Sequence, residues 1–94
     1  LDYYKQALAI YKKIGDLQGT ANQLENIGLI YQNKGDMEQA LGFHEQALQI
    51  RQKIVDLQGT ATSLGNIGLV YKDQGKFDRA FDYFQKAFQI HQKI

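Results

Sequence analysis

Few residues of this chain have the type and spacing that catalysis or metal binding requires. His44 and His91 are the only histidines, and Ser63 is the only serine. Neither histidine belongs to an H-E-x-x-H motif or another metal-ligand spacing, and no nucleophile motif surrounds Ser63. His44 lies on an apolar stripe, where a second copy of the same pattern carries Phe84, which predicts a core histidine. We therefore predict no catalytic residue, no metal site and no cofactor, and we do not expect an enzyme.

The other polar residues are best explained as helix caps and surface charge. We interpret Asp36 with Glu38, and Asp78 with Asp82, as helix caps and surface charge. His91 replaces Arg51 on a helix face that we expect to be solvated. The glycines do not form a G-x-G-x-x-G or G-x-x-x-x-G-K phosphate loop.

Composition narrows the classes of partner. The formal net charge is +1, with eleven basic and ten acidic residues among 94. The basic footprint of a nucleic-acid-binding protein is therefore missing. No apolar run approaches the ~18 residues of a membrane span, so we expect no membrane contact. The absence of cysteine excludes disulfides and thiolate zinc sites, and it fits a reducing, cytoplasmic compartment.

The chain repeats itself at a spacing of forty positions. Residues 14–53 and 54–93 are identical at about half of their aligned pairs, including the run DLQGTA. Residues 1–14 align with the second half of each copy. A fixed period of this size is typical of a solenoid. We predict a single domain over 1–94, made of 1–16 as the second helix of a preceding repeat and of two repeats at 17–56 and 57–94.

Each copy has the periodicity of two helices. Leu24, Ile27 and Tyr31 recur at steps of three and four, the spacing of one buried helix face. Gly35 and Gly75 fall where a helix would end in a left-handed residue. The expected helices are 1–14, 17–33, 37–54, 57–73 and 77–94.

Three aspartates supply the predicted N-caps. Asp16, Asp36 and Asp56 precede predicted helices, where a carboxylate oxygen can accept from the free N–H groups of the first turn. The second copy has Lys76 in place of Asp36, and we expect this turn to be less stable.

The two copies share a set of apolar and small residues: Leu24, Ile27, Gly28, Tyr31, Gly35, Ala40 and Ala47 in the first, and Leu64, Ile67, Gly68, Tyr71, Gly75, Ala80 and Ala87 in the second. The pattern resembles the tetratricopeptide repeat (TPR) along the whole chain. Its period exceeds the usual ~34 residues and is similar to that of Pins-like adaptors and bacterial regulatory arrays. The resemblance implies an all-α fold, an α-α superhelix of about five antiparallel helices, with half a repeat followed by two full repeats.

The resemblance also implies a protein–protein interaction scaffold. In this family the first helices of successive repeats line a concave groove that holds an extended peptide or a partner helix. Mapped onto this sequence, the groove positions are Asn22, Glu25, Asn26, Leu29, Gln32 and Asn33 in the first copy, and Thr62, Gly65, Asn66, Leu69, Lys72 and Asp73 in the second.

The groove positions indicate the class of ligand. Family members that clamp a terminal carboxylate carry Asn where this chain has Leu29 and Leu69, together with Lys and Arg. We therefore expect a neutral or amphipathic peptide and not a chaperone C-terminus. Asn26 and Asn66 could bind a ligand or bond within the fold, since an amide both donates and accepts.

Two alternatives to groove binding stay open. The chain could be a regulatory or sensor segment of a multidomain bacterial signalling protein, or a structural array that associates with itself. Self-association is suggested by the aromatic residues of the two end helices, which have no further helix to cover them. These residues are Tyr3, Tyr4, Leu8 and Tyr11 in the first helix and Phe77, Phe81, Phe84 and Phe88 in the last.

Overall fold

The computed structural model describes all residues from 1 to 94 and consists of helices joined by short turns. The elements are α1 (Asp2–Ile14), α2 (Leu17–Asn33), α3 (Met37–Lys53), α4 (Leu57–Asp73) and α5 (Phe77–Lys93). The predicted bounds differ from these by at most one residue at either end. The predicted all-α class is confirmed.

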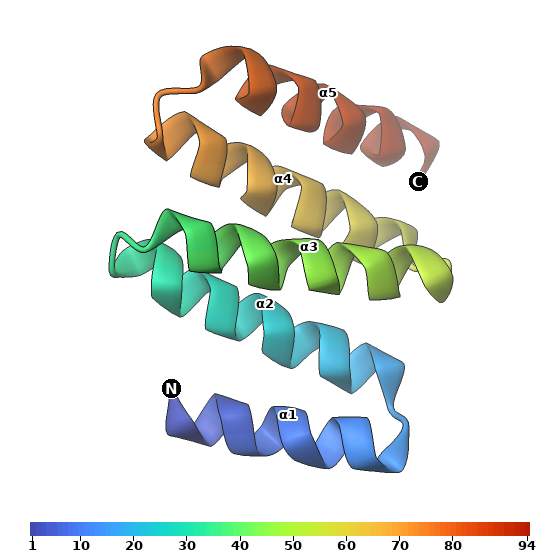
Figure 1. The fold of residues 1–94 in the computed structure, drawn as a ribbon. Coiled ribbons are helices and arrows are strands. Elements are labelled where there is room, and N and C mark those ends of the chain that lie inside the picture. The colour runs from blue at the N-terminus through green and yellow to red at the C-terminus, as the bar shows by residue number, and fades with distance from the viewer.

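The helices follow one another in an antiparallel row, with the two termini at opposite ends of the row (Figure 1). Each helix packs against its neighbours in sequence, α1 on α2, α2 on α3, α3 on α4 and α4 on α5. The row measures 37 × 32 × 13 Å, so its thinnest dimension is close to the diameter of one helix, about 10–12 Å. An array of this shape buries apolar surface only between adjacent helices, which confirms the predicted solenoid.

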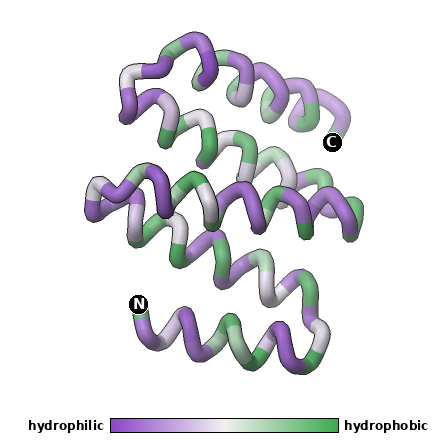
Figure 2. The backbone as a smooth tube through the Cα atoms, in the orientation of Figure 1, coloured by the Kyte–Doolittle hydropathy of each residue, from purple (hydrophilic) through white to green (hydrophobic).

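Small residues allow these helices to approach closely. In the first copy Ala21 and Ala47, both fully buried, meet Leu24 between α2 and α3. Ala61, Leu64 and Ala87 form the same cluster between α4 and α5. Apolar and polar positions alternate along every helix in Figure 2, as expected where one side packs and the other faces solvent.

One glycine in each copy accommodates a ring from the following helix. A Cβ atom at Gly28 would lie 2.8 Å from His44, and one at Gly68 would lie 2.7 Å from the ring of Phe84. Both distances are too short for any side chain. The predicted equivalence of His44 and Phe84 is therefore confirmed, and each ring fills the space its glycine leaves.

The residues of the two end helices, α1 and α5, were predicted to lack a covering helix, and the prediction holds better for α5 than for α1. On α5, Phe77, Phe81 and Phe88 are exposed as expected, but the expectation is wrong for Phe84, which is half-buried because its ring packs against Gly68 and the core. On α1 the expectation is wrong for two residues. Leu8 packs against the core cluster between α2 and α3, and the ring of Tyr11 lies against Gly19.

The three predicted caps are found at the starts of α2, α3 and α4. Asp16 and Asp56 accept the backbone N–H of the third residue that follows at 2.8 Å, and Asp36 does so at 3.3 Å. Lys76 makes no such bond, which agrees with the weaker turn predicted for the second copy. Its ammonium instead lies 5.9 Å from the centre of the Tyr71 ring, a cation–π arrangement.

Val55 is the one non-glycine residue with a positive φ, 56°. It occupies the position that Gly15 has after α1, where φ is 75°. A β-branched side chain is strained in this region because its Cβ atom crowds the backbone. The Val55 side chain is 75% exposed, so no packing offsets the strain.

Replacing Val55 by glycine should therefore stabilise the fold. We expect the free energy of unfolding to rise by about 0.5–1 kcal/mol, since relief of ~1–2 kcal/mol of strain exceeds the entropy that glycine adds to the unfolded chain. Urea denaturation followed by circular dichroism measures the change. Gly15→Val, the reciprocal change at the equivalent turn, should destabilise the protein. A Val55→Gly variant less stable than the parent would contradict this explanation.

Candidate functional site

The predicted groove residues lie on α2 and α4. Leu29 and Leu69 are 38% and 40% exposed, which is high for leucine side chains at the centre of a helical array. Asn22, Asn33, Thr62, Lys72 and Asp73 are exposed, and Asn26, Gln32, Gly65 and Asn66 are half-buried. We call the surface of these residues the α2–α4 face. Glu25 is the exception, because only 5% of it is accessible.

Glu25 turns inward and ties α2 to α3 and α4. Its Oε2 accepts from the Ser63 hydroxyl at 2.6 Å, and its Oε1 accepts from the Asn66 amide at 3.0 Å. Oε1 also accepts from Nδ1 of His44. Glu25 therefore cannot contact a ligand as predicted. Glu25 accepts a hydrogen bond from Asn66 within the fold. Of the two roles predicted for the Asn66 amide, ligand binding or a bond within the fold, the structure contains the second.

Arg51 supplies the opposite charge from α3. Its Nη1 lies 3.3 Å from Glu25 Oε2 and donates to the Gly59 carbonyl at 3.0 Å, and its Nη2 donates to Asn22 at 3.2 Å. Arg51 is only 6% exposed, so the expectation of a solvated face at this position is wrong. His91, its equivalent in the second copy, is exposed as expected.

His44 is a core histidine, as predicted, and is fully buried. Its Nε2 lies 3.2 Å from the side-chain oxygen of Gln32, while Nδ1 faces Glu25. Both ring nitrogens thus face oxygen atoms, and a protonated ring would donate to both. The histidine connects Gln32, on the α2–α4 face, to the buried carboxylate.

The pKa of Glu25 reflects a balance of opposing effects. Burial by itself raises the pKa of this carboxyl group. The hydrogen bonds from His44, Ser63 and Asn66, together with the charge of His44, outweigh burial and bring the pKa below its ordinary value of 4.5. The cluster therefore holds Glu25 in its ionised form at neutral pH.

We name Glu25, His44, Arg51, Ser63 and Asn66 the buried polar cluster. It occurs only between the first and second copies, because the second copy has Gly65, Phe84 and His91 in place of the three charged or titratable members. One signal in the sequence could have revealed it. Arg51 follows His44 by seven residues, which places both side chains on the same helix face.

The side chains of the buried polar cluster hydrogen-bond α2 to α3 and α4. No group of three or more His, Asp or Glu side chains has the arrangement of a metal site. None of the five helices is both long and apolar enough to cross a membrane.

Comparison with known proteins gives the family and the fold. A sequence profile described as Tetratricopeptide repeat matches residues 19–93. The crystal structure of BtubC (BKLC) from P. vanneervenii is similar, with a TM-score of 0.88 and 30% identity over 98% of this chain. This chain spans 39% of the length of that protein. No functionally curated protein matches the sequence significantly.

Two further solved structures resemble this chain in fold alone, because their sequence identity to it is low. The TPR domain of Arabidopsis FLU has a TM-score of 0.87 at 19% identity, over 97% of this chain and 76% of that domain. The crystal structure of MamA has a TM-score of 0.69 at 23% identity, and the match covers 98% of this chain and 58% of the MamA chain.

The buried polar cluster should make folding stability depend on pH through Glu25. Because the folded pKa lies below the unfolded value, the stabilisation is complete above pH 4.5 and is lost as pH falls through the folded pKa. Glu25→Gln should remove this part of the pH dependence. It should also cost about 3 kcal/mol at pH 7, because Arg51 is left buried without its carboxylate.

Urea denaturation at a series of pH values measures both effects. Glu45→Gln, on the exposed side of α3, is the control and should leave the curve close to that of the parent. Equal pH dependence in the parent and the Glu25→Gln variant would contradict the role given to this carboxylate.

Proposed function

Because the chain belongs to the tetratricopeptide repeat family, whose members serve as protein–protein interaction scaffolds, we propose that it binds a peptide or a helix of a partner protein along the α2–α4 face. Leu29 and Leu69 carry the proposal. They hold equivalent places on α2 and α4, and both leave apolar surface accessible among polar neighbours. Two apolar anchors surrounded by amides suit a ligand with alternating apolar and polar groups.

The charges of this face favour a neutral or amphipathic ligand. Lys72 is its only exposed cation, and Asp73 follows it directly. Arg51 is engaged by Glu25 and does not add a free positive charge. A clamp for a terminal carboxylate would need unpaired cations, since charge-assisted hydrogen bonds give such sites their strength.

The amides of the two copies contribute differently to this proposal. Asn66 donates to Glu25, which fixes the direction of its side chain and leaves its carbonyl oxygen free to accept from a ligand. Asn26 makes no side-chain hydrogen bond and can turn to donate or accept. Glu25 itself acts below the surface, as a support for Asn66.

A peptide selection tests the proposal. A phage-displayed library of random twelve-residue peptides, selected against the chain, should yield binders with apolar residues. Their binding should weaken at least about tenfold with Leu29→Glu plus Leu69→Glu, because two buried contacts are replaced by desolvated charges.

The matched control is Leu17→Glu plus Leu57→Glu. These leucines are also equivalent, exposed and on α2 and α4, but they lie at the first position of each helix, about three helical turns before Leu29 and Leu69. Binding should survive in the control. Binders that tolerate the Leu29 and Leu69 changes and lose affinity in the control would overturn the assignment.

We also propose, on a separate observation, that the chain associates with itself through its end helices. Phe77, Phe81 and Phe88 are each more than half exposed along one side of α5, and Tyr3 and Ile10 are similarly exposed on α1. Apolar surface of this kind is rare on a monomer. A second copy could cover both ends at once by packing α5 of one chain on α1 of the next.

Sedimentation equilibrium at about 0.1 mM tests self-association, a concentration at which small interfaces of this class are populated. The parent should form oligomers, and Phe81→Glu plus Phe88→Glu should give monomers. Gln46→Glu plus Gln49→Glu adds the same charge to the exposed side of α3 and should leave the oligomers intact. A monomeric parent would refute the proposal without affecting the peptide site.

A further inference from the structure

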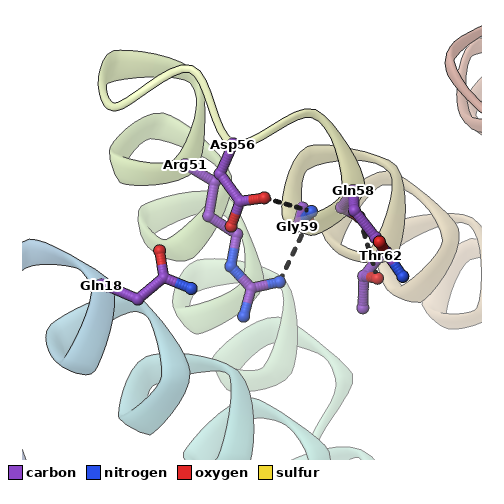
Figure 3. Close-up of a pocket in the computed structure, with 6 residues that line it drawn as sticks. All are labelled: Gln18, Arg51, Asp56, Gln58, Gly59 and Thr62. Carbon is purple, nitrogen blue, oxygen red and sulfur yellow. Dashed lines mark hydrogen bonds between the residues drawn. The ribbon is translucent and has the colours of Figure 1, made fainter. Parts of the chain in front are cut away.

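A polar cavity of about 340 Å³ lies where the first turns of α2 and α4 approach the end of α3. Its lining residues are Gln18, Arg51, Asp56, Gln58, Gly59 and Thr62 (Figure 3). Gln18 lies one helical turn before Asn22, and Thr62 belongs to the α2–α4 face. The cavity is therefore an extension of that face toward the start of the two helices, beyond the residues predicted for the groove except Thr62.

The two copies differ at the position of Arg51, which lines the cavity. Tyr11 occupies the equivalent place in front of α2, and its ring contacts Gly19, where any Cβ atom would collide with it. Arg51 replaces this ring in front of α4. Its guanidinium group pairs with Glu25 and donates to Ser63, to the Gly59 carbonyl and to Asn22.

Polar groups without partners remain at this cavity. Arg51 has 8% of its side chain exposed, and its Nε–H is buried without a hydrogen bond. Figure 3 shows the amide of Gln18 directed toward this guanidinium, although no hydrogen bond joins the two. Asp56 uses Oδ1 to cap α4, which leaves Oδ2 as a free acceptor. The side-chain amide of Gln58 also makes no hydrogen bond.

The charges exclude most ligand classes. An anion would meet Asp56, and the charge of Arg51 is already offset by Glu25 at 3.3 Å. A cation would meet the guanidinium group that forms the floor. A neutral group with one donor and one acceptor fits both the donors and the acceptor that line the cavity. Its carbonyl can accept from Arg51 or a glutamine, and its N–H can donate to Asp56.

We propose that this cavity is a binding subsite for a neutral carboxamide, such as the side chain of Asn or Gln in a partner peptide. Its volume, about 340 Å³, lies just above the lower bound of ligand pockets, about 300 Å³, and leaves room for a side chain together with part of the peptide backbone. When the carboxamide enters, its oxygen accepts from the side-chain amide of Gln18 or Gln58, and its N–H donates to Oδ2 of Asp56, beside the Arg51 guanidinium. The proposal relies on the peptide-binding function only for the origin of the ligand, and the subsite is tested without it.

NMR titration of the ¹⁵N-labelled 94-residue chain tests the subsite, with the Nε–H signal of Arg51 as the reporter. The probes are propionamide, propionate and propylammonium, which share a carbon chain and differ in charge, each up to about 100 mM because so small a ligand binds weakly. Propionamide should shift the signal to saturation. The two ions should not.

Two variants localise the effect. Gln18→Ala plus Gln58→Ala keeps the buried polar cluster and removes two hydrogen-bonding groups, so propionamide should bind about tenfold more weakly. Gln49→Ala, an exposed glutamine of α3 outside the cavity, should bind it as the parent does.

Three outcomes would overturn the subsite. These are a shift that does not saturate with propionamide, a stronger effect of propionate or propylammonium, and equal binding by the parent and the double glutamine variant. Titration of the Leu29→Glu plus Leu69→Glu variant separates this proposal from the previous one. If the peptide site is wrongly assigned but the subsite is real, propionamide still saturates in every chain that keeps Gln18 and Gln58.

Discussion

The carboxylate of Glu25 lies between two repeats, and a buried charge of this kind destabilises a fold by several kcal/mol unless it is paired and hydrogen-bonded. Its partners therefore have to be present together. Arg51 and His44 come from α3, and Ser63 and Asn66 come from α4. Because these partners belong to different helices, the ion pair fixes how the first repeat sits on the second. Because the α2–α4 face is formed by one helix from each repeat, its geometry depends on this packing of the two repeats.

The same backbone arrangement is stabilised in the two copies by different means. Gly28 and Gly68 each leave space for a ring from the next helix, which is His44 in the first copy and Phe84 in the second. Small residues thus determine how closely helices approach. The residues around them decide whether an interface is polar or apolar. The cavity beside Arg51 lies at the polar interface between the two copies.

Local signals in the sequence were sufficient for the helices and not for the cluster. Helix bounds and caps depend on residues within one or two turns of each other, as Asp56 and Gly59 do. The bond between Glu25 and Asn66 joins residues 41 positions apart and depends on the rotation of two helices. The family pattern placed Glu25 on the ligand side because the pattern gives the average orientation of that position. Its side chain turned inward because two buried donors and a guanidinium group were available there. Val55 was missed for a different reason, because valine is not a residue type that marks a left-handed turn, although the alignment with Gly15 places it at one.

The central claim is that Glu25 couples the two repeats, and a double-mutant cycle between Glu25→Gln and Ser63→Ala tests it most directly. The two side chains lie on different repeats and are joined by a hydrogen bond of 2.6 Å. Free energies of unfolding from urea denaturation at pH 7 should show a coupling of about 1 kcal/mol or more, as expected for contacting residues of one network. Additivity of the two single changes to within about 0.3 kcal/mol would mean that the carboxylate and the hydroxyl act independently, and it would contradict the account.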